Sequence, residues 1–121
     1  MDKDTLGALV KQPGQDPTIF LNEDDSPTRK RFTCAHEIGH FVRRSREEPE
    51  YTRVDLRNSL SATGEDQEEV YANEFAACLL MPEDEVRRLS KNGFSDLEMA
   101  IRFGVSRAAM QYRLKNLNLA S

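Results

Sequence analysis

The stretch His36-Glu-Ile-Gly-His40 fits the pattern HExxH and contains both histidines of the 121-residue chain. Each residue of a helix turns the chain by about 100°, so His36 and His40 lie within about 40° of each other, one turn apart. Two imidazoles that project side by side can ligate one Zn²⁺. Glu37 lies about 60° beyond His40, close enough to reach a water at the metal without ligating the metal itself. The stretch therefore predicts a helix that carries a metal site.

An ordinary amphipathic helix with two histidines on its polar face would show the same pattern, and HExxH alone produces false positives. Two features favour the metal site: the motif takes both histidines of the chain, and its helix begins with clear signals. Ser26 suits the N-cap and Pro27 the first helical position, and the helical pattern runs to about Arg44. Gly39 costs about 1 kcal/mol of helix propensity relative to alanine, which suggests that another segment packs closely there.

A catalytic zinc site needs a third protein ligand and an open fourth position. The chain has no third histidine, so the ligand is expected to be a carboxylate or Cys78. Cys34 lies about 160° around the motif helix from His36 and cannot join the site without distortion. Cys78 is expected to be buried as a packing residue.

The second strong helix, from about Asp66 to Leu80, is where a carboxylate ligand is expected. One stripe along it has the spacing of a helix face: Glu69, Ala72, Asn73, Ala76 and Leu80. The alanines would let this helix lie close against the motif helix, which would hold Glu69 near the histidines. Asn73, one turn later, could hydrogen-bond the second nitrogen of a ligating histidine and fix its tautomer.

Glu69 has an alternative role, because Asp66 could be an N-cap with Glu69 as its capping-box partner. Glu68 and Glu74 are weaker candidates for the third ligand. The sequence leaves these possibilities open.

The rest of the chain predicts a small α+β fold in which helices dominate. Residues 6–10 and 18–21 are β-prone and flank a turn-rich segment, so they indicate a hairpin. Residues 51–56 alternate like a partly exposed third strand, and residues 57–64 indicate a loop.

The C-terminal third predicts three helices, the last two arranged as a helix–turn–helix. Pro82 can open the first, which Asn92-Gly93 ends. Ser95-Asp-Leu-Glu98 forms a capping box, Gly104 makes a turn, and Ser106 caps a final helix to about residue 116.

Composition indicates one compact domain with a modest core, since 38% of the residues are hydrophobic and 31% charged. The net charge of −4 argues against a surface built wholly to bind nucleic acid or anionic membranes. No apolar run approaches the roughly 20 residues of a membrane span, residues 1–4 do not begin a signal peptide, and two cysteines are too few for a disulfide scaffold. A cytoplasmic protein is expected.

Two segments resemble the signature blocks of the ImmA/IrrE family of zinc metallopeptidases: Arg31-Phe-Thr-Cys-Ala-His-Glu-Ile-Gly-His40 and Glu69-Val-Tyr-Ala-Asn-Glu-Phe-Ala-Ala-Cys-Leu-Leu-Met-Pro82. Together they are far more specific than HExxH alone. The resemblance extends to the hairpin and to the tail, where Phe103-Gly-Val-Ser106 is similar to a frequent family ending. One departure is visible, because Tyr71 stands where the family pattern has a second glutamate.

The resemblance implies a zincin-like, gluzincin-type fold, in which a short antiparallel sheet packs on two active-site helices. Residues 1–82 would form this core, and residues 83–121 a helix–turn–helix-like tail packed on it. His36, His40 and Glu69 would be the zinc ligands, with Asn73 supporting one histidine, and Glu37 would be the catalytic base. Zn²⁺ is the expected metal, with Mn²⁺ as an alternative.

The resemblance also implies a cytoplasmic endopeptidase that cleaves a specific protein, namely a helix–turn–helix repressor encoded nearby, in stress or mobile-element regulation. The residue that stabilises the oxyanion is not identified; Tyr51, Tyr112 and the backbone of residues 51–56 are candidates. Two other functions stay open: a catalytically silent zinc-binding regulator, and a DNA-binding protein. The second is disfavoured, because the stretch from Ala100 to residue 121 has four basic residues (Arg102, Arg107, Arg113 and Lys115) but few side chains suited to reading bases.

Overall fold

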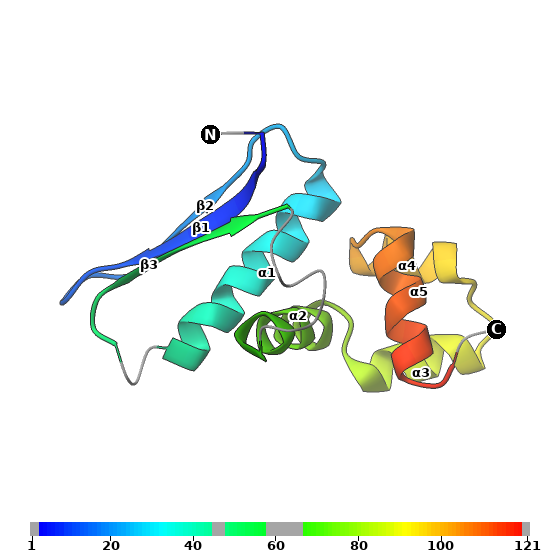
Figure 1. Ribbon diagram of the computed structural model, residues 1–121. Helices are drawn as coiled ribbons and strands as arrows, with labels where there is room; N and C mark the ends of the chain where they lie inside the picture. The colour runs from blue at the N-terminus through cyan, green and yellow to red at the C-terminus, as the bar shows by residue number, and fades with distance from the viewer. Residues whose placement is uncertain (1–2, 45–47, 58–66, 120–121) are drawn as a thin grey trace. The chain divides into compact units, whose positions relative to one another are not determined.

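The structure is a computed structural model, which describes residues 3–44, 48–57 and 67–119. The chain divides into two compact units, Met1–Ala76 and Ala77–Ser121. The boundary falls within helix α2 (Gln67–Leu80). The predicted small α+β fold is confirmed, since the described residues contain three strands and five helices (Figure 1).

The strands of the first unit form one antiparallel sheet in the order β2-β1-β3. They are β1 (Thr5–Lys11), β2 (Thr18–Leu21) and β3 (Tyr51–Leu56). The predicted hairpin pairs β1 with β2, and β3 pairs with the other side of β1 in a register that sets Leu9 opposite Arg53. Because β1 occupies the centre, β3 lies at an edge of the sheet that the described strands form.

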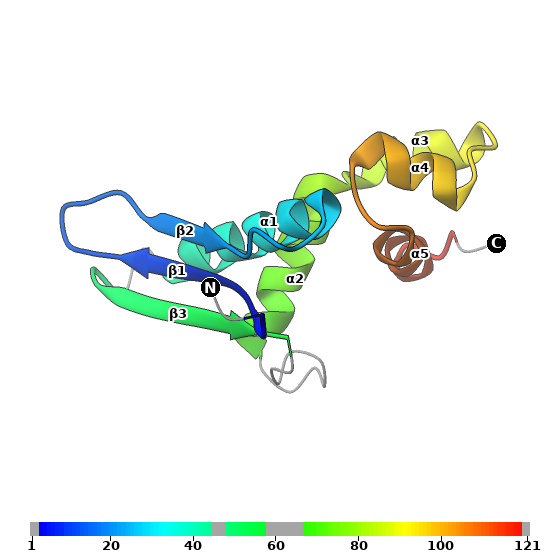
Figure 2. The ribbon, with the colours of Figure 1, turned by 90° about the horizontal axis from the view of Figure 1, so that it is seen from above.

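Helix α1 (Pro27–Arg44) lies along one face of this sheet (Figure 2). It begins as predicted: the Ser26 hydroxyl accepts a hydrogen bond from the backbone N–H of Arg29 at 3.2 Å. The sheet approaches α1 closely at Gly7, where an added Cβ would lie 2.7 Å from Cγ2 of Thr33. The buried face of α1 therefore looks toward the centre of the sheet, where Leu9 is fully buried.

Helix α2 packs against α1 at the glycine of the motif. A Cβ built on Gly39 would lie 3.1 Å from Cα of Ala72 and 3.1 Å from Cβ of Phe75. The close approach that Gly39 and the alanines predicted is therefore present, and it brings the first turn of α2 beside the histidines. Its predicted N-cap, Asp66, lies outside the described residues, as does most of the predicted loop at 57–64.

The second unit contains α3 (Glu83–Lys91), α4 (Asp96–Phe103) and α5 (Arg107–Asn116). The predicted capping box at Ser95 is present, and the Ser106 side chain caps α5. Gly104 adopts φ 69°, a left-handed conformation that suits glycine and turns the chain from α4 into α5. The core of this unit is apolar and includes Val86, Leu89, Met99, Met110 and Leu114. In the parts of the chain that the structure describes, no helix is both long and apolar enough to cross a membrane.

Candidate metal centre

The two motif histidines project from adjacent turns of α1 toward the same point. His36 and His40 are 7% and 0% exposed, and their Nε2 atoms lie 3.0 Å apart. Such a short separation between two imidazole nitrogens requires a proton or a cation between or beside them, because two lone pairs this close repel each other.

Glu69 joins the histidines from the first turn of α2. Its Oε1 atom lies 2.7 Å from Nε2 of His40, and its Oε2 atom lies 3.1 Å from Nε2 of His36. The side chain is buried, at 2% exposure. The close packing of α1 and α2 at Gly39 thus places a carboxylate against both histidines.

Oxygen acceptors hold the outer nitrogen of each histidine. Nδ1 of His36 donates to Oδ1 of Asn73 at 2.8 Å, and Nδ1 of His40 donates to Oε2 of Glu68 at 2.9 Å. Because carboxylate and amide oxygens only accept, both imidazoles carry a proton on Nδ1, so Nε2 is the nitrogen that each offers to a metal. Glu68, a weaker ligand candidate in the sequence, therefore contacts the outer side of His40.

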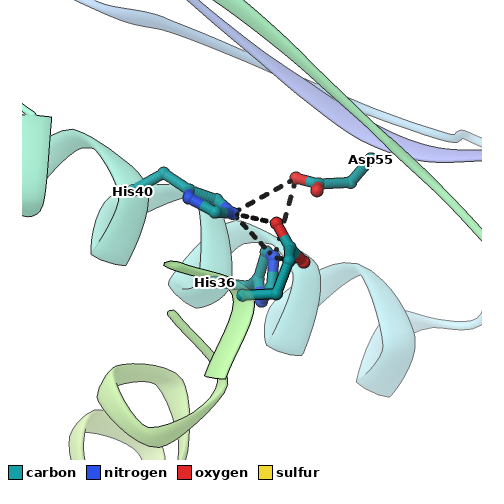
Figure 3. Close-up of side chains that lie close together, drawn as sticks. His36, His40 and Asp55 are labelled. Atoms are coloured by element: carbon teal, nitrogen blue, oxygen red, sulfur yellow. Dashed lines mark hydrogen bonds and ion pairs between the residues drawn. The ribbon is translucent and has the colours of Figure 1, made fainter. Parts of the chain in front are cut away.

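Asp55, which the sequence did not single out, enters the site from β3. Its Oδ2 atom lies 3.6 Å from Nε2 of His36 and 3.7 Å from Nε2 of His40 (Figure 3). The side chain is 4% exposed, and its Oδ2 atom has no hydrogen-bond partner in the described part of the chain. His36, His40, Asp55 and Glu69 are all buried, and they offer ligand atoms that lie within 4.8 Å of one another.

Arg53, two residues earlier on the same face of β3, was also missed. Its Nε atom donates to Nε2 of His40 at 3.1 Å, and its guanidinium group pairs with Glu68 at 3.1 Å and with Glu69. Burial along β3 identifies the face on which Arg53 lies: positions 51 and 55 are buried and position 53 is half-buried, while Val54 is 54% exposed. A strand that turns polar residues inward and apolar residues outward marks a site rather than a core.

Glu37 is fully buried beside the histidines. Neither of its carboxylate oxygens has a hydrogen-bond partner among the residues that the structure describes. Burial, together with the nearby Asp55 carboxylate, raises the pKa of Glu37 to about 9. Gly7 leaves the room for this side chain, because a Cβ there would lie 3.3 Å from Oε2 of Glu37.

In the metal-free site, the buried carboxylates of Asp55 and Glu69 stabilise positively charged groups beside them. Burial alone would lower the pKa of His36, but the nearby Asp55 and Glu69 carboxylates outweigh it and raise the pKa to about 10. Burial would likewise raise the pKa of Glu69, and hydrogen bonds from both histidines lower it below its usual range.

The donor set suits a divalent transition metal. Two imidazole nitrogens and carboxylate oxygens are ligands that Zn²⁺ prefers. Both histidines hold their outer nitrogen, Nδ1, in a hydrogen bond, which leaves Nε2 to face a metal, and a buried oxygen of Asp55 that has no hydrogen-bond partner among the described residues faces them. The residues present therefore fit a metal ion of this class.

Other candidates from the sequence lie elsewhere or differ from expectation. Glu74 is exposed, and Cys34 is a half-buried free thiol. The expectation that Cys78 is buried was wrong: it is exposed, because it lies on the side of α2 opposite the stripe that ends in Leu80. Tyr51 is buried, and its hydroxyl lacks a hydrogen-bond partner within the described ranges, whereas Tyr112 is exposed on α5.

Comparison with known proteins gives a family match over almost the whole chain. The model of the family Peptidase_M78, described as IrrE N-terminal-like domain, matches residues 2–115. No curated protein gives a significant match. The matched range includes every residue of the site described above.

Proposed function

Because the chain belongs to the Peptidase_M78 family of IrrE N-terminal-like domains, we propose that it is a zinc-dependent endopeptidase that cleaves a specific protein. The observation that carries this proposal is the position of Glu37. A buried carboxylate without a hydrogen-bond partner among the described residues stands next to a cluster that suits a metal ion. A purely structural metal site has no need of such a group.

His36, His40 and Glu69 would hold the metal, with Zn²⁺ as the expected ion and Mn²⁺ as the alternative. When bound, the ion supplies Lewis acidity, which polarises the peptide carbonyl and makes water a stronger acid. Asn73 and Glu68 hold the two imidazoles in the required tautomer through the contacts described above.

Glu37 serves as the general base in this proposal. The pKa of about 9 applies to the metal-free site, and a cation held beside Glu37 would favour the ionised carboxylate. In that form Glu37 takes a proton from the attacking water and passes it to the nitrogen of the leaving amine. Nothing in the described part of the chain competes for its oxygens, and Gly7 and the buried face of α1 keep them away from solvent.

Arg53 supplies the donor for the developing oxyanion in this proposal. Its guanidinium group already reaches His40 and Glu69, and its side chain is 20% exposed, so part of it remains accessible from outside. Tyr51, on the same face of β3, is a second donor, since its buried hydroxyl has no hydrogen-bond partner among the described residues. The edge of β3 offers backbone groups to which an extended peptide can add as a further strand.

The proposed substrate is a helix–turn–helix transcriptional repressor encoded near this protein, on the basis of the resemblance of the two motif segments. Residues 83–121 are proposed to be a docking tail for a protein partner. Exposed apolar side chains support this use: Ile101 is 74% exposed and Tyr112 is 66% exposed.

The contacts of the tail do not favour direct DNA binding. Arg107 pairs with Asp96 at 3.1 Å, and the buried Arg113 donates to the backbone oxygen of Met81 at 3.1 Å. Arg102 lies 3.8 Å from Glu85. Three of the four basic side chains from Ala100 to residue 121 are thus engaged within the second unit, which reduces the charge that this stretch offers for phosphate contacts.

The proposal is tested with the product of a neighbouring repressor-like gene. Wild-type protein with Zn²⁺ is expected to cut it into discrete fragments, whereas the chelated wild type and the Glu37→Gln variant leave it intact. Glu74→Gln, which changes an exposed glutamate of α2, is the matched control and is expected to cut normally. Cleavage by Glu37→Gln at the wild-type rate would refute the assignment of Glu37.

A further inference from the structure

Asp55 is the one residue of the buried cluster to which the proposed mechanism gives no role. Its Oδ1 atom lies 3.6 Å from Nε of Arg53, whereas its Oδ2 atom faces the two histidines (Figure 3). This second oxygen is buried and has no hydrogen-bond partner within the described residues. This oxygen lies at 3.6 and 3.7 Å from the two Nε2 atoms, too far for a hydrogen bond. A buried carboxylate oxygen without a hydrogen bond is costly, so its orientation toward the Nε2 atoms calls for a ligand.

The spacing of the four side chains has the size of a tetrahedral metal site. Ligand atoms at zinc bond lengths of about 2.0–2.1 Å are separated by about 3.3 Å in a tetrahedron. The two Nε2 atoms are 3.0 Å apart, and they lie 3.1 Å and 2.7 Å from oxygens of Glu69. Oδ2 of Asp55 lies 3.6 Å and 3.7 Å from the same nitrogens. These values differ from the tetrahedral spacing by up to about 0.6 Å, and all four ligand atoms lie within 4.8 Å of one another.

We propose that Asp55 is a fourth protein ligand, which closes the metal site in the resting protein. This inference rests on the proposed function, since it concerns the same metal. A site with four protein ligands leaves no position for water, whereas catalysis needs one. The resting protein is therefore latent, and the Asp55 carboxylate has to withdraw before a peptide or water can enter.

The neighbourhood of Asp55 provides for that withdrawal. Arg53 is on the same face of the edge strand β3 and lies beside Oδ1, so its guanidinium group can pair with the released carboxylate. Movement of Asp55 requires no change in α1 or α2, which hold the other three ligands. Asp55 can thus leave and rejoin the metal while the ion stays bound to His36, His40 and Glu69.

The test uses the full chain loaded with Co²⁺, whose visible absorption changes when its ligands change. Azide, a small anion, is titrated into the wild type, the Asp55→Ala variant and an Asp16→Ala control, which removes an exposed aspartate between β1 and β2. The spectra of the wild type and the control are expected not to respond, whereas that of Asp55→Ala shifts as azide binds at the vacated position. In competition with a chromophoric chelator, Asp55→Ala is expected to bind Zn²⁺ at least about 10-fold more weakly, since even residues behind the ligands cost this much.

Folding of each metal-free variant is checked by circular dichroism, and Asp55→Asn, which keeps the shape of the side chain, replaces Asp55→Ala if the latter does not fold. The inference is overturned if azide shifts the wild-type spectrum as strongly as that of the variant, or if the Zn²⁺ affinities are equal. A wild-type chain that binds neither Co²⁺ nor Zn²⁺ would overturn the proposed function as well. The two failures are therefore distinguishable.

Discussion

The Nδ1 atom of His36 lies 2.8 Å from the Oδ1 atom of Asn73, a residue 37 positions later in the chain. This contact joins α1 to α2 at the level of the metal site. Because the amide oxygen only accepts, it keeps a proton on Nδ1 and turns the Nε2 atom of His36 toward Glu69 and Asp55.

Removing this acceptor is expected to weaken metal binding. Asn73→Leu should lower Zn²⁺ affinity by about 10–100-fold, because His36 is then free to rotate and to change tautomer. Asn73→Asp keeps an acceptor and is expected to stay closer to the wild type. Chelator competition measures both variants, and Asn116→Leu, at an exposed position of α5, is the control. Equal affinities for Asn73→Leu and the wild type would mean that the contact does not position His36.

Glu37 is expected to reduce the stability of the metal-free protein. Its buried carboxylate has no hydrogen-bond partner among the described residues, and such a group costs about 1–3 kcal/mol. Glu37→Leu is therefore expected to raise the thermal midpoint measured with chelator by several degrees (about 4–8 °C per kcal/mol for a small domain). Glu74→Leu, at an exposed position, should not. A lower midpoint for Glu37→Leu would show that the carboxylate contributes to folding.

The Gly39→Ala variant distinguishes helix propensity from packing, because the two change the free energy of unfolding in opposite directions. Propensity alone would stabilise α1 by about 1 kcal/mol. The added Cβ, however, would lie 3.1 Å from both Ala72 and Phe75, and overpacking of this kind costs about 1–3 kcal/mol. We expect net destabilisation in urea unfolding together with weaker Zn²⁺ binding, since α2 carries Glu69. An increase in stability would contradict the close packing of α1 and α2.

The metal-free protein is expected to lose stability as the pH rises from 6.5 to about 9. The pKa of His36 is raised from 6.5 to about 10, so its contribution is complete below 6.5 and disappears toward 10. The pKa of Glu37 is raised from 4.5 to about 9, so over this range the folded state also holds a proton that the unfolded state has released. Both groups act in the same direction.

Urea unfolding with chelator at several pH values measures this dependence. The midpoint should fall across the range in the wild type, and should fall less in Glu37→Leu, which retains only the His36 component. A midpoint that stays constant or rises with pH would contradict the raised pKa values of His36 and Glu37.

Local helix geometry explains why part of the site could be predicted from the sequence. His36 and His40 need only a helix to lie side by side. Glu69 needs two helices to pack, and the small residues Gly39 and Ala72 predicted that packing. The caps at Ser26, Ser95 and Ser106 are also local, and so the helix boundaries followed from the sequence.

Asp55 and Arg53 could not be placed in the same way, because their position depends on strand pairing and on which face of β3 is buried. Alternation alone gives two faces without assigning them, and apolar Val54 and Leu56 would by default be placed inward. In the structure β3 pairs with β1 so that both point outward, at 54% and 47% exposure. The polar side chains then face α1, a long-range outcome that no short motif records.

The metal content of the purified protein tests the central claim most directly. The account predicts one tightly bound divalent ion per wild-type chain, measured by elemental analysis after dialysis, and the same content in Glu37→Gln. It predicts almost none in His40→Ala and Glu69→Ala, which lose ligands. A wild-type chain without metal, or a Glu69→Ala chain that keeps its full complement, would contradict the assignment of His36, His40 and Glu69 as one metal centre.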